Sequence, residues 1–136
     1  MSLNYYFEEV KDFPISQHVN KWIENSILSE KKKAGEISFI FCSDEYLLKI
    51  NKEHLDHDYY TDVITFDYVV DDEISGDIFI SIDRIEENAK EYNVSFKDEL
   101  NRIMIHGVLH LLGYKDKEKD EKELMTKKED EYLSKR

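Results

Sequence analysis

Two histidines and an aspartate occupy the segment His106-Gly-Val-Leu-His110-Leu-Leu-Gly113-Tyr-Lys-Asp116. Side chains four residues apart lie on the same face of an α-helix, so the imidazoles of His106 and His110 can converge on one ion. Gly113 is expected to end that helix and turn the chain, which brings Asp116 back as a third ligand. Three protein ligands with one open position are typical of a catalytic zinc site. The segment therefore predicts one zinc ion, Zn2+, per chain.

The histidine pair has a second interpretation, because histidines on buried helices also satisfy hydrogen bonds without a metal. Here His106 and His110 interrupt an otherwise apolar helix, where two unpartnered imidazoles would carry a desolvation cost. A shared metal removes that cost. Zincin proteases place a glutamate directly after the first histidine as general base, but this chain has Gly107 there, which makes peptide hydrolysis the weaker hypothesis.

The elements that must position this segment follow from hydrophobic spacing. Alternating or β-branched runs predict strands over residues 3–8, 36–43, 63–68 and 77–82. The last two are expected to pair as a hairpin, with a turn over residues 71–76. Five helices are also predicted. The first follows a cap at Ser16, continues to Glu30 and is ended by Gly35, and the second runs from a cap at Asp44 to about His54. The other three cover residues 83–92, residues 96–112 after a cap at Ser95, and the chain from residue 118 onwards.

Strands come early in this order and helices dominate later, which predicts an α+β fold. We expect residues 1–136 to form a single compact domain, a metallohydrolase domain by its motif. It should contain a small mixed sheet of about four strands covered by about five helices, one of which is a zincin-like metal-site helix. The last, highly charged segment is expected to be a solvated amphipathic helix, although Glu121 and Glu129 are carboxylates to inspect near the metal.

Composition limits the cellular context and the partners. Nineteen basic and 31 acidic residues give a net charge of −12, which argues against broad attraction to a polyanion, and DNA is not an expected partner. Lys31, Lys32 and Lys33 form either part of an RNA-facing patch or a helix-end cluster. Cys42, the single cysteine, lies in an apolar run that favours a buried, reduced thiol. We expect a cytoplasmic protein without a membrane segment.

Several motifs together resemble one protein family. The segment His106-Gly-Val-Leu-His110-Leu-Leu-Gly-Tyr114 is accompanied by Thr61-Asp62-Val-Ile-Thr-Phe66, by Gly76-Asp77-Ile and by Asn51. In order and spacing these motifs resemble the YbeY family of bacterial metal-dependent endoribonucleases, which are also described as ribosomal RNA maturation factors. The resemblance covers roughly residues 36–130. It implies a compact α+β fold, a zinc site and a role in ribosomal RNA processing and ribosome quality control.

Two positions depart from the pattern of that family. Asp116 stands where relatives usually carry a third histidine, so the ligand set keeps its number but gains a negative charge. Leu55 stands where relatives usually carry an arginine that could bind phosphate. We hypothesise that His54 or His57, which flank this position, supplies part of the missing positive charge. Asp62 is a candidate for contacting the substrate or a ligand, with a loop-bracing role as the simpler interpretation.

The leading functional hypothesis is a zinc-dependent, single-strand-specific endoribonuclease that acts on ribosomal RNA, with ribosomes or ribosomal proteins as partners. His106 and His110 would act catalytically through the metal that they share with Asp116. Two other hypotheses remain open: a noncatalytic ribosome-associated metal-binding factor, and a metallohydrolase of another substrate class.

Overall fold

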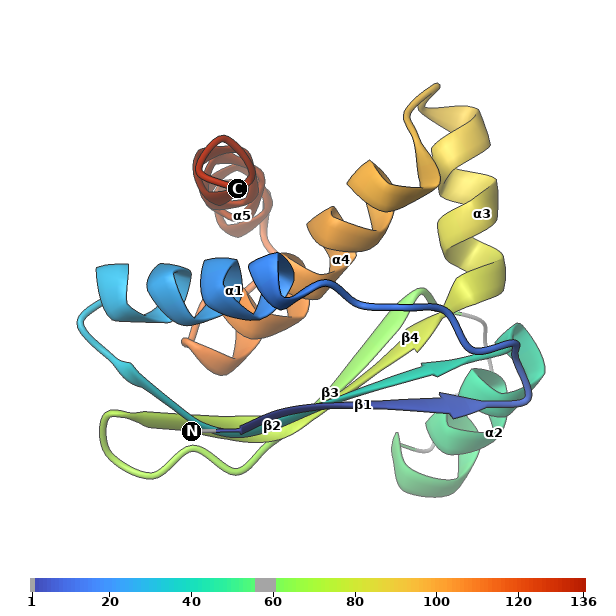
Figure 1. Cartoon of the computed structure of the whole chain (residues 1–136), viewed down its shortest axis with the longest axis horizontal. Helices are drawn as coiled ribbons and strands as arrows, with labels where there is room; N and C mark the ends of the chain where they lie inside the picture. Colours follow the sequence, from blue (N-terminus) through green and yellow to red (C-terminus); the bar gives the residue numbers. More distant parts are fainter. Residues whose placement is uncertain (1, 56–60) are drawn as a thin grey trace.

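The computed structural model of the chain describes residues 2–55 and 61–136. Within these ranges the chain forms one four-stranded sheet and five helices (Figure 1). The order is β1 (Ser2–Glu8), α1 (Gln17–Ser29), β2 (Lys33–Cys42), α2 (Asp44–Leu55), β3 (Val63–Asp67), β4 (Glu73–Ser81), α3 (Ile82–Glu91), α4 (Phe96–Leu111) and α5 (Lys119–Leu133). The predicted α+β class is confirmed.

The sheet is mixed, as predicted, with the spatial order β1-β2-β4-β3. Strand β2 is parallel to both β1 and β4, whereas β3 is antiparallel to β4 and forms the predicted hairpin with it. Helices α1 and α4 lie on one face of the sheet and α2 lies on the other (Figure 1). Because side chains alternate along a strand, the central strands must be apolar on both faces where helices cover them.

The main core lies between the sheet and the layer that contains α1 and α4. Phe39 and Phe41 of β2 stand opposite Ile78 and Ile80 of β4, and all four side chains are fully buried. A smaller cluster consists of Cys42 of β2, Leu47 of α2 and Ile64 of β3. Burial raises the pKa of the Cys42 thiol to about 12, so the predicted buried, free cysteine is confirmed.

Helix α4 lies directly against the hairpin because glycine occupies both contact positions. A Cβ atom added to Gly107 of α4 would lie 2.7 Å from Cγ2 of Ile78 on β4. A Cβ atom added to Gly76 of β4 would lie 2.5 Å from the carbonyl oxygen of Phe66 and 2.8 Å from Cδ2 of Leu111. The face of α4 that carries Gly107 is therefore closed, and a glutamate at the position of a zincin base would collide with the sheet.

The charged C-terminal segment is a helix with one face docked against the protein and the other exposed to solvent. Met125, Glu129 and Tyr132 of α5 are all buried. The indole Nε1 of Trp22 in α1 donates a hydrogen bond of 2.7 Å to the carbonyl oxygen of Tyr132. The predicted amphipathic helix is present and most of its residues are exposed, but the buried residues recur at positions i, i+4 and i+7, so one face of the helix is packed against the rest of the protein.

A single carboxylate, Glu30 at the end of α1, connects three parts of this layer. It accepts hydrogen bonds from the hydroxyl of Tyr114, at 2.5 Å, and from the hydroxyl of Tyr132. The ammonium group of Lys128 in α5 donates a third, at 3.2 Å. Glu30 therefore joins the end of α1, the chain that follows α4, and α5.

Four local predictions about element boundaries were wrong. Helix α1 ends at Ser29 and the chain turns at Lys31, which has φ of +63°, so Gly35 does not end the helix but lies inside β2. A Cβ atom on Gly35 would collide with Ser75 of β4, which explains the glycine by packing. Lys33 is likewise the first residue of β2, not a helix-end residue.

The other two wrong predictions concern the turn between β3 and β4 and the residue that caps the start of α2. The turn is confined to residues 70–73, with Asp71 at φ of +55°, so Gly76 lies within β4 rather than in the turn. Helix α2 is capped by Ser43, whose hydroxyl accepts a hydrogen bond of 3.1 Å from the amide of Tyr46. Asp44 instead pairs with Arg84 of α3 at 2.7 Å. None of the described helices has the length and apolar character needed to cross a membrane.

We expect Gly107→Ala to destabilise the fold. Alanine favours a helix over glycine by about 1 kcal/mol, but overpacking a filled contact costs about 1–3 kcal/mol. The free energy of unfolding in urea should therefore fall by up to about 2 kcal/mol. Lys97→Ala, on the exposed start of the same helix, is the matched control and should change it by less than about 0.5 kcal/mol. A higher urea midpoint for Gly107→Ala would contradict the close contact.

The Glu30 cluster predicts a pH-dependent contribution to stability. Burial raises the pKa of the Glu30 carboxyl, but the hydrogen bonds from Tyr114, Tyr132 and Lys128 outweigh burial and hold the pKa below its ordinary value. A carboxyl with a lower pKa in the folded state stabilises the fold above its unfolded pKa of about 4.3, and this stabilisation is lost as the pH falls through the folded pKa.

We therefore expect Glu30→Gln to lower the free energy of unfolding at neutral pH by about 1–3 kcal/mol. The difference from wild type should shrink as urea unfolding is repeated from about pH 7 down to about pH 3. Glu86→Gln, at an exposed position on α3, serves as the control. A difference that stayed constant across this range would show that the Glu30 charge does not stabilise the fold.

Candidate metal centre

The predicted metal segment is the last part of α4 and the turn that follows it. Ser95 caps the start of the helix by accepting a hydrogen bond of 3.0 Å from the amide of Asp98. At the other end of the helix Gly113 takes φ of +105°. The amide of Gly113 donates a hydrogen bond to the carbonyl oxygen of His110, and the amide of Tyr114 donates one to the carbonyl oxygen of Leu109. This pair of hydrogen bonds is a Schellman motif, so the predicted role of Gly113 as helix terminator is confirmed.

The turn brings together all three residues that were predicted as metal ligands. The Nε2 atoms of His106 and His110 are 3.0 Å apart. The Oδ2 atom of Asp116 lies 3.2 Å from each of these nitrogens. In the described part of the chain, these three residues form the group of histidine and carboxylate side chains whose ligand atoms are near enough to share one ion.

The hydrogen bonds on the other side of each ring determine which nitrogen carries the proton. His110 Nδ1 lies 3.0 Å from the carbonyl oxygen of Tyr114, which can only accept, so Nδ1 must be the donor. His106 Nδ1 lies 2.6 Å from Oε2 of Glu129, and a carboxylate also accepts only. In both neutral rings the Nε2 atom is therefore left with a lone pair, which is the form that binds a metal.

Three lone-pair atoms thus face one another at distances of 3.0–3.2 Å. Such an arrangement is repulsive unless a metal cation lies between the atoms or one of the nitrogens carries an additional proton. Tetrahedral zinc with bonds of about 2.0–2.1 Å holds its ligand atoms about 3.3 Å apart, which is close to the observed spacing. Two imidazole nitrogens and one carboxylate oxygen are also ligands that zinc accepts. The residues present therefore fit a zinc ion.

The electrostatics of the cluster favour positive charge. Burial lowers the pKa of the His106 imidazole, but the hydrogen bond to Glu129 and the negative charges of Glu129, Asp62 and Asp116 outweigh it and raise the pKa above its ordinary value. Exposure increases across the site, from 16% for the His106 side chain to 23% for His110 and 39% for Asp116. The centre is consequently accessible from the side of Asp116.

The other sequence candidates lie outside the three-atom cluster. Asp62 is partly buried at the start of β3, where its carbonyl oxygen accepts a hydrogen bond of 3.0 Å from the amide of Ser81, and its charge still acts on His106. His54 is exposed near the end of α2, with its ring 5.9 Å from that of Phe66. Leu55, at the expected arginine position, is 38% exposed. His57 lies outside the described residues.

The residue that sequence reasoning undervalued is Glu129. It is 7% exposed and contacts a ring of the metal cluster directly, although it lies in the segment predicted to be solvated. The sequence signal that could have identified Glu129 as buried is its helical spacing from the apolar residues Met125 and Tyr132. Glu121, the other inspected carboxylate, instead caps α5 by accepting a hydrogen bond of 2.9 Å from the amide of Glu118.

Fold and site together define a small α+β protein with a candidate metal centre of two histidines and one carboxylate. The family model described as Endoribonuclease YbeY matches residues 4–136. Endoribonuclease YbeY of Flavobacterium johnsoniae is 52% identical over 132 residues, which cover 97% of this chain and 95% of that protein. Endoribonuclease YbeY of Bacteroides thetaiotaomicron is 47% identical over 137 residues, which cover 100% of both chains. This chain therefore belongs to the endoribonuclease YbeY family.

A solved structure supports the same assignment at the level of the fold. The solution structure of TM1509 from Thermotoga maritima matches with a TM-score of 0.67 and 26% sequence identity. The match covers 96% of this chain and 87% of that protein. The family resemblance that the sequence motifs predicted is thus confirmed, together with the enzyme class that the family name states.

We expect the purified protein to bind one equivalent of zinc and Asp116→Asn to bind it more than about 100-fold more weakly. Loss of a direct ligand should exceed the roughly 10–100-fold loss that follows removal of a ligand's hydrogen-bond partner. Competition with a chromophoric chelator measures the zinc dissociation constants of wild type and of Asp116→Asn. Asp120→Asn, in the exposed first turn of α5, should keep the wild-type affinity. Equal affinities for wild type and Asp116→Asn would remove Asp116 from the ligand set.

Proposed function

We propose that this protein is a zinc-dependent, single-strand-specific endoribonuclease that acts on ribosomal RNA in its maturation and in ribosome quality control. The observation that carries the proposal is the convergence of His106 Nε2, His110 Nε2 and Asp116 Oδ2 in a chain of the endoribonuclease YbeY family. The ribosomal substrate rests on the resemblance of the motifs, and the cytoplasm is the compartment that such a substrate requires.

The chemistry assigns separate tasks to the residues of the site. Zinc, when bound, supplies a Lewis acid that polarises water or a phosphate oxygen. His106 and His110 present neutral Nε2 atoms because their Nδ1 protons are already donated to Glu129 and to the carbonyl of Tyr114. Asp62 is the further carboxylate whose charge reaches the centre, and we assign it a contact with substrate or a ligand.

Binding of RNA must overcome the net charge of −12. Lys32 provides a positive charge near the proposed metal centre. It lines a surface pocket together with Glu30, Gly113 and Tyr114, next to the turn that leads to Asp116. Local cations, the metal and ribosomal partners would together attract the phosphates. Affinity for RNA should consequently be strongly salt-dependent. His54 and His57 remain the candidates for the phosphate contact that Leu55 cannot make.

Two other functions use the same ligands. A noncatalytic ribosome-associated metal-binding factor is favoured by the exposed Leu55 at the position where an arginine is expected. A metallohydrolase of another class, such as a peptidase, is disfavoured by the contact between Gly107 and Ile78, which leaves no space for a glutamate base. RNA cleavage by protein of known metal content distinguishes these functions.

We expect zinc-loaded wild type to cut a single-stranded ribosomal RNA fragment and to leave the same sequence intact as a duplex. His110→Ala, purified in parallel, should lower the cleavage rate by about 100-fold or more, because it removes a ligand of the charge-stabilising metal. Joint replacement of His54 and His57 by alanine should lower the rate less, by about tenfold, through loss of phosphate contacts.

Each alternative result has a definite meaning. Equal cleavage by wild type and His110→Ala would identify a contaminating nuclease. Zinc binding without RNA cleavage would favour the noncatalytic factor, and cleavage of a peptide panel would favour the other hydrolase class. An unchanged rate after replacement of both histidines would exclude them from phosphate binding.

A further inference from the structure

The buried carboxylate of Glu129 uses its two oxygens for two different partners. Oε2 accepts a hydrogen bond of 2.6 Å from Nδ1 of His106, and Oε1 accepts one of 2.7 Å from Nη1 of Arg102. The Glu129 side chain is 9% exposed. A buried carboxylate with only one of these partners would carry a large desolvation penalty, so the two contacts are needed together.

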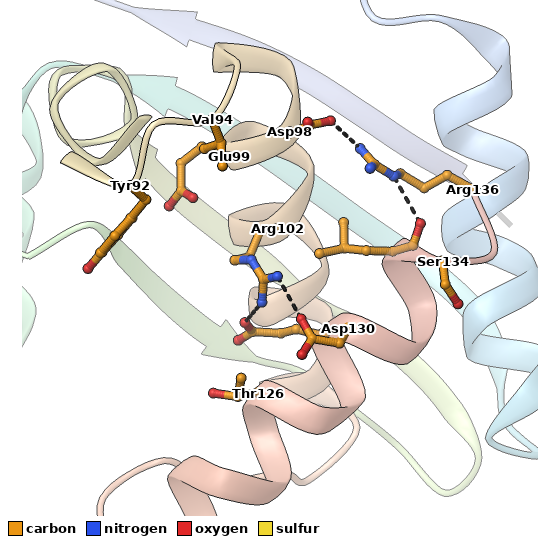
Figure 2. Close-up of a pocket in the computed structure, with 11 residues that line it drawn as sticks. Tyr92, Val94, Asp98, Glu99, Arg102, Thr126, Asp130, Ser134 and Arg136 are labelled. Carbon is orange, nitrogen blue, oxygen red and sulfur yellow. Dashed lines mark hydrogen bonds and ion pairs between the residues drawn. The ribbon is translucent and has the colours of Figure 1, made fainter. Parts of the chain in front are cut away.

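Arg102 in turn is held by a second carboxylate. Its Nη2 atom donates to Oδ1 of Asp130 at 2.7 Å, so the guanidinium group bridges two neighbouring residues of α5. Figure 2 shows Arg102 extending from α4 towards α5, where it meets Asp130 at the wall of a surface pocket. The Arg102 contact fixes the Glu129 oxygen that faces away from His106, which leaves the other oxygen directed at the ring.

The helix that supplies Glu129 is itself fixed at several points. Tyr132 is joined to α1 through the indole of Trp22 and through Glu30, and Lys128 also binds Glu30. These contacts lie within one turn of Glu129 on either side. They set both the rotation and the position of α5 along its axis, which a hydrogen bond of 2.6 Å to a buried ring requires.

We propose that Glu129 is a positioning residue for the metal centre, which fixes the tautomer and the direction of the His106 ring while Arg102 holds Glu129 in place. The inference rests on the proposed metal-binding function of His106, His110 and Asp116. It assigns to α5, the charged end of the chain, a direct part in metal affinity. His110 has a different support, because a main-chain carbonyl holds its ring and no side-chain substitution removes that atom.

Glu129→Gln provides a sharp test because glutamine has nearly the same shape but only one acceptor oxygen. If that oxygen faces Arg102, the amide NH2 faces His106 and forces the ring to accept at Nδ1, which places its proton on Nε2 and blocks metal binding. If the oxygen faces His106, the amide NH2 opposes the guanidinium group. Neither orientation reproduces the two contacts of the carboxylate.

Asp130→Asn is the matched control. Asp130 contacts the same guanidinium group as Glu129 and carries the same charge, but its side chain is 61% exposed and its contact is with Arg102 rather than with the ring. Both variants remove one negative charge from adjacent positions of α5. A difference between them therefore reports the contact with His106 rather than net charge or helix docking.

The experiment measures zinc affinity by chelator competition, the visible absorption spectrum of the cobalt-substituted protein, and urea unfolding of the metal-free protein. We expect Glu129→Gln to weaken zinc binding by about 10–100-fold and to alter the cobalt spectrum. Asp130→Asn should stay within about threefold of wild type with an unchanged spectrum. The unfolding data show whether Glu129→Gln remains folded under the conditions of the binding measurement.

The outcomes separate this inference from the function on which it rests. If wild type binds no zinc, the proposed metal site is wrong. If wild type binds zinc and folded Glu129→Gln binds it equally well with the same cobalt spectrum, only the positioning role is wrong. An equal loss in both variants would assign the effect to the charge of α5 and would also overturn the role of Glu129. Should Glu129→Gln unfold, Arg102→Lys, which keeps the charge but loses the forked contact, must show the affinity loss instead.

Discussion

The contact between α4 and the β3–β4 hairpin is the constraint on which the metal centre depends. Gly107 and Gly76 let the helix approach until Ile78 and Leu111 fill the space that a Cβ atom would need. A helix held this closely cannot rotate or slide without opening the core. Its remaining surface, with both histidines, is consequently presented in a fixed direction, and helix geometry places the two imidazole rings side by side on that surface.

Two further supports turn a pair of converging rings into a defined site. The Schellman motif at Gly113 brings back both the carboxylate of Asp116 and the carbonyl oxygen that orients His110. Helix α5 supplies the second support, Glu129, from a segment that is joined to α1 through Glu30. The ligands are thus local in sequence, whereas the groups that orient them come from the helix terminus in one case and from a distant helix in the other.

This division explains what could be predicted from the sequence. His106, His110, Gly113 and Asp116 lie within eleven residues, so helical spacing and a glycine turn were sufficient to bring them together. The strands, the hairpin and the five helices also followed from apolar spacing. Gly35 and Gly76 were misread as turn residues because a glycine that permits close packing between strands or helices has the same local sequence signal as one that permits a turn.

Glu129 illustrates why the rest could not be predicted. A charge-rich helix is exposed in most proteins, and the role of this one carboxylate depends on partners 23 and 27 residues away in the sequence.

Arg102 also has an electrostatic consequence for the proposed reaction. Zinc with Asp116 as its single anionic ligand would retain one net positive charge, and an uncompensated Glu129 would cancel it. Arg102, which Glu129 shares with the exposed Asp130, offsets part of the charge of Glu129, so the orienting hydrogen bond weakens the attraction of the centre for a phosphate group less than an unpaired carboxylate would.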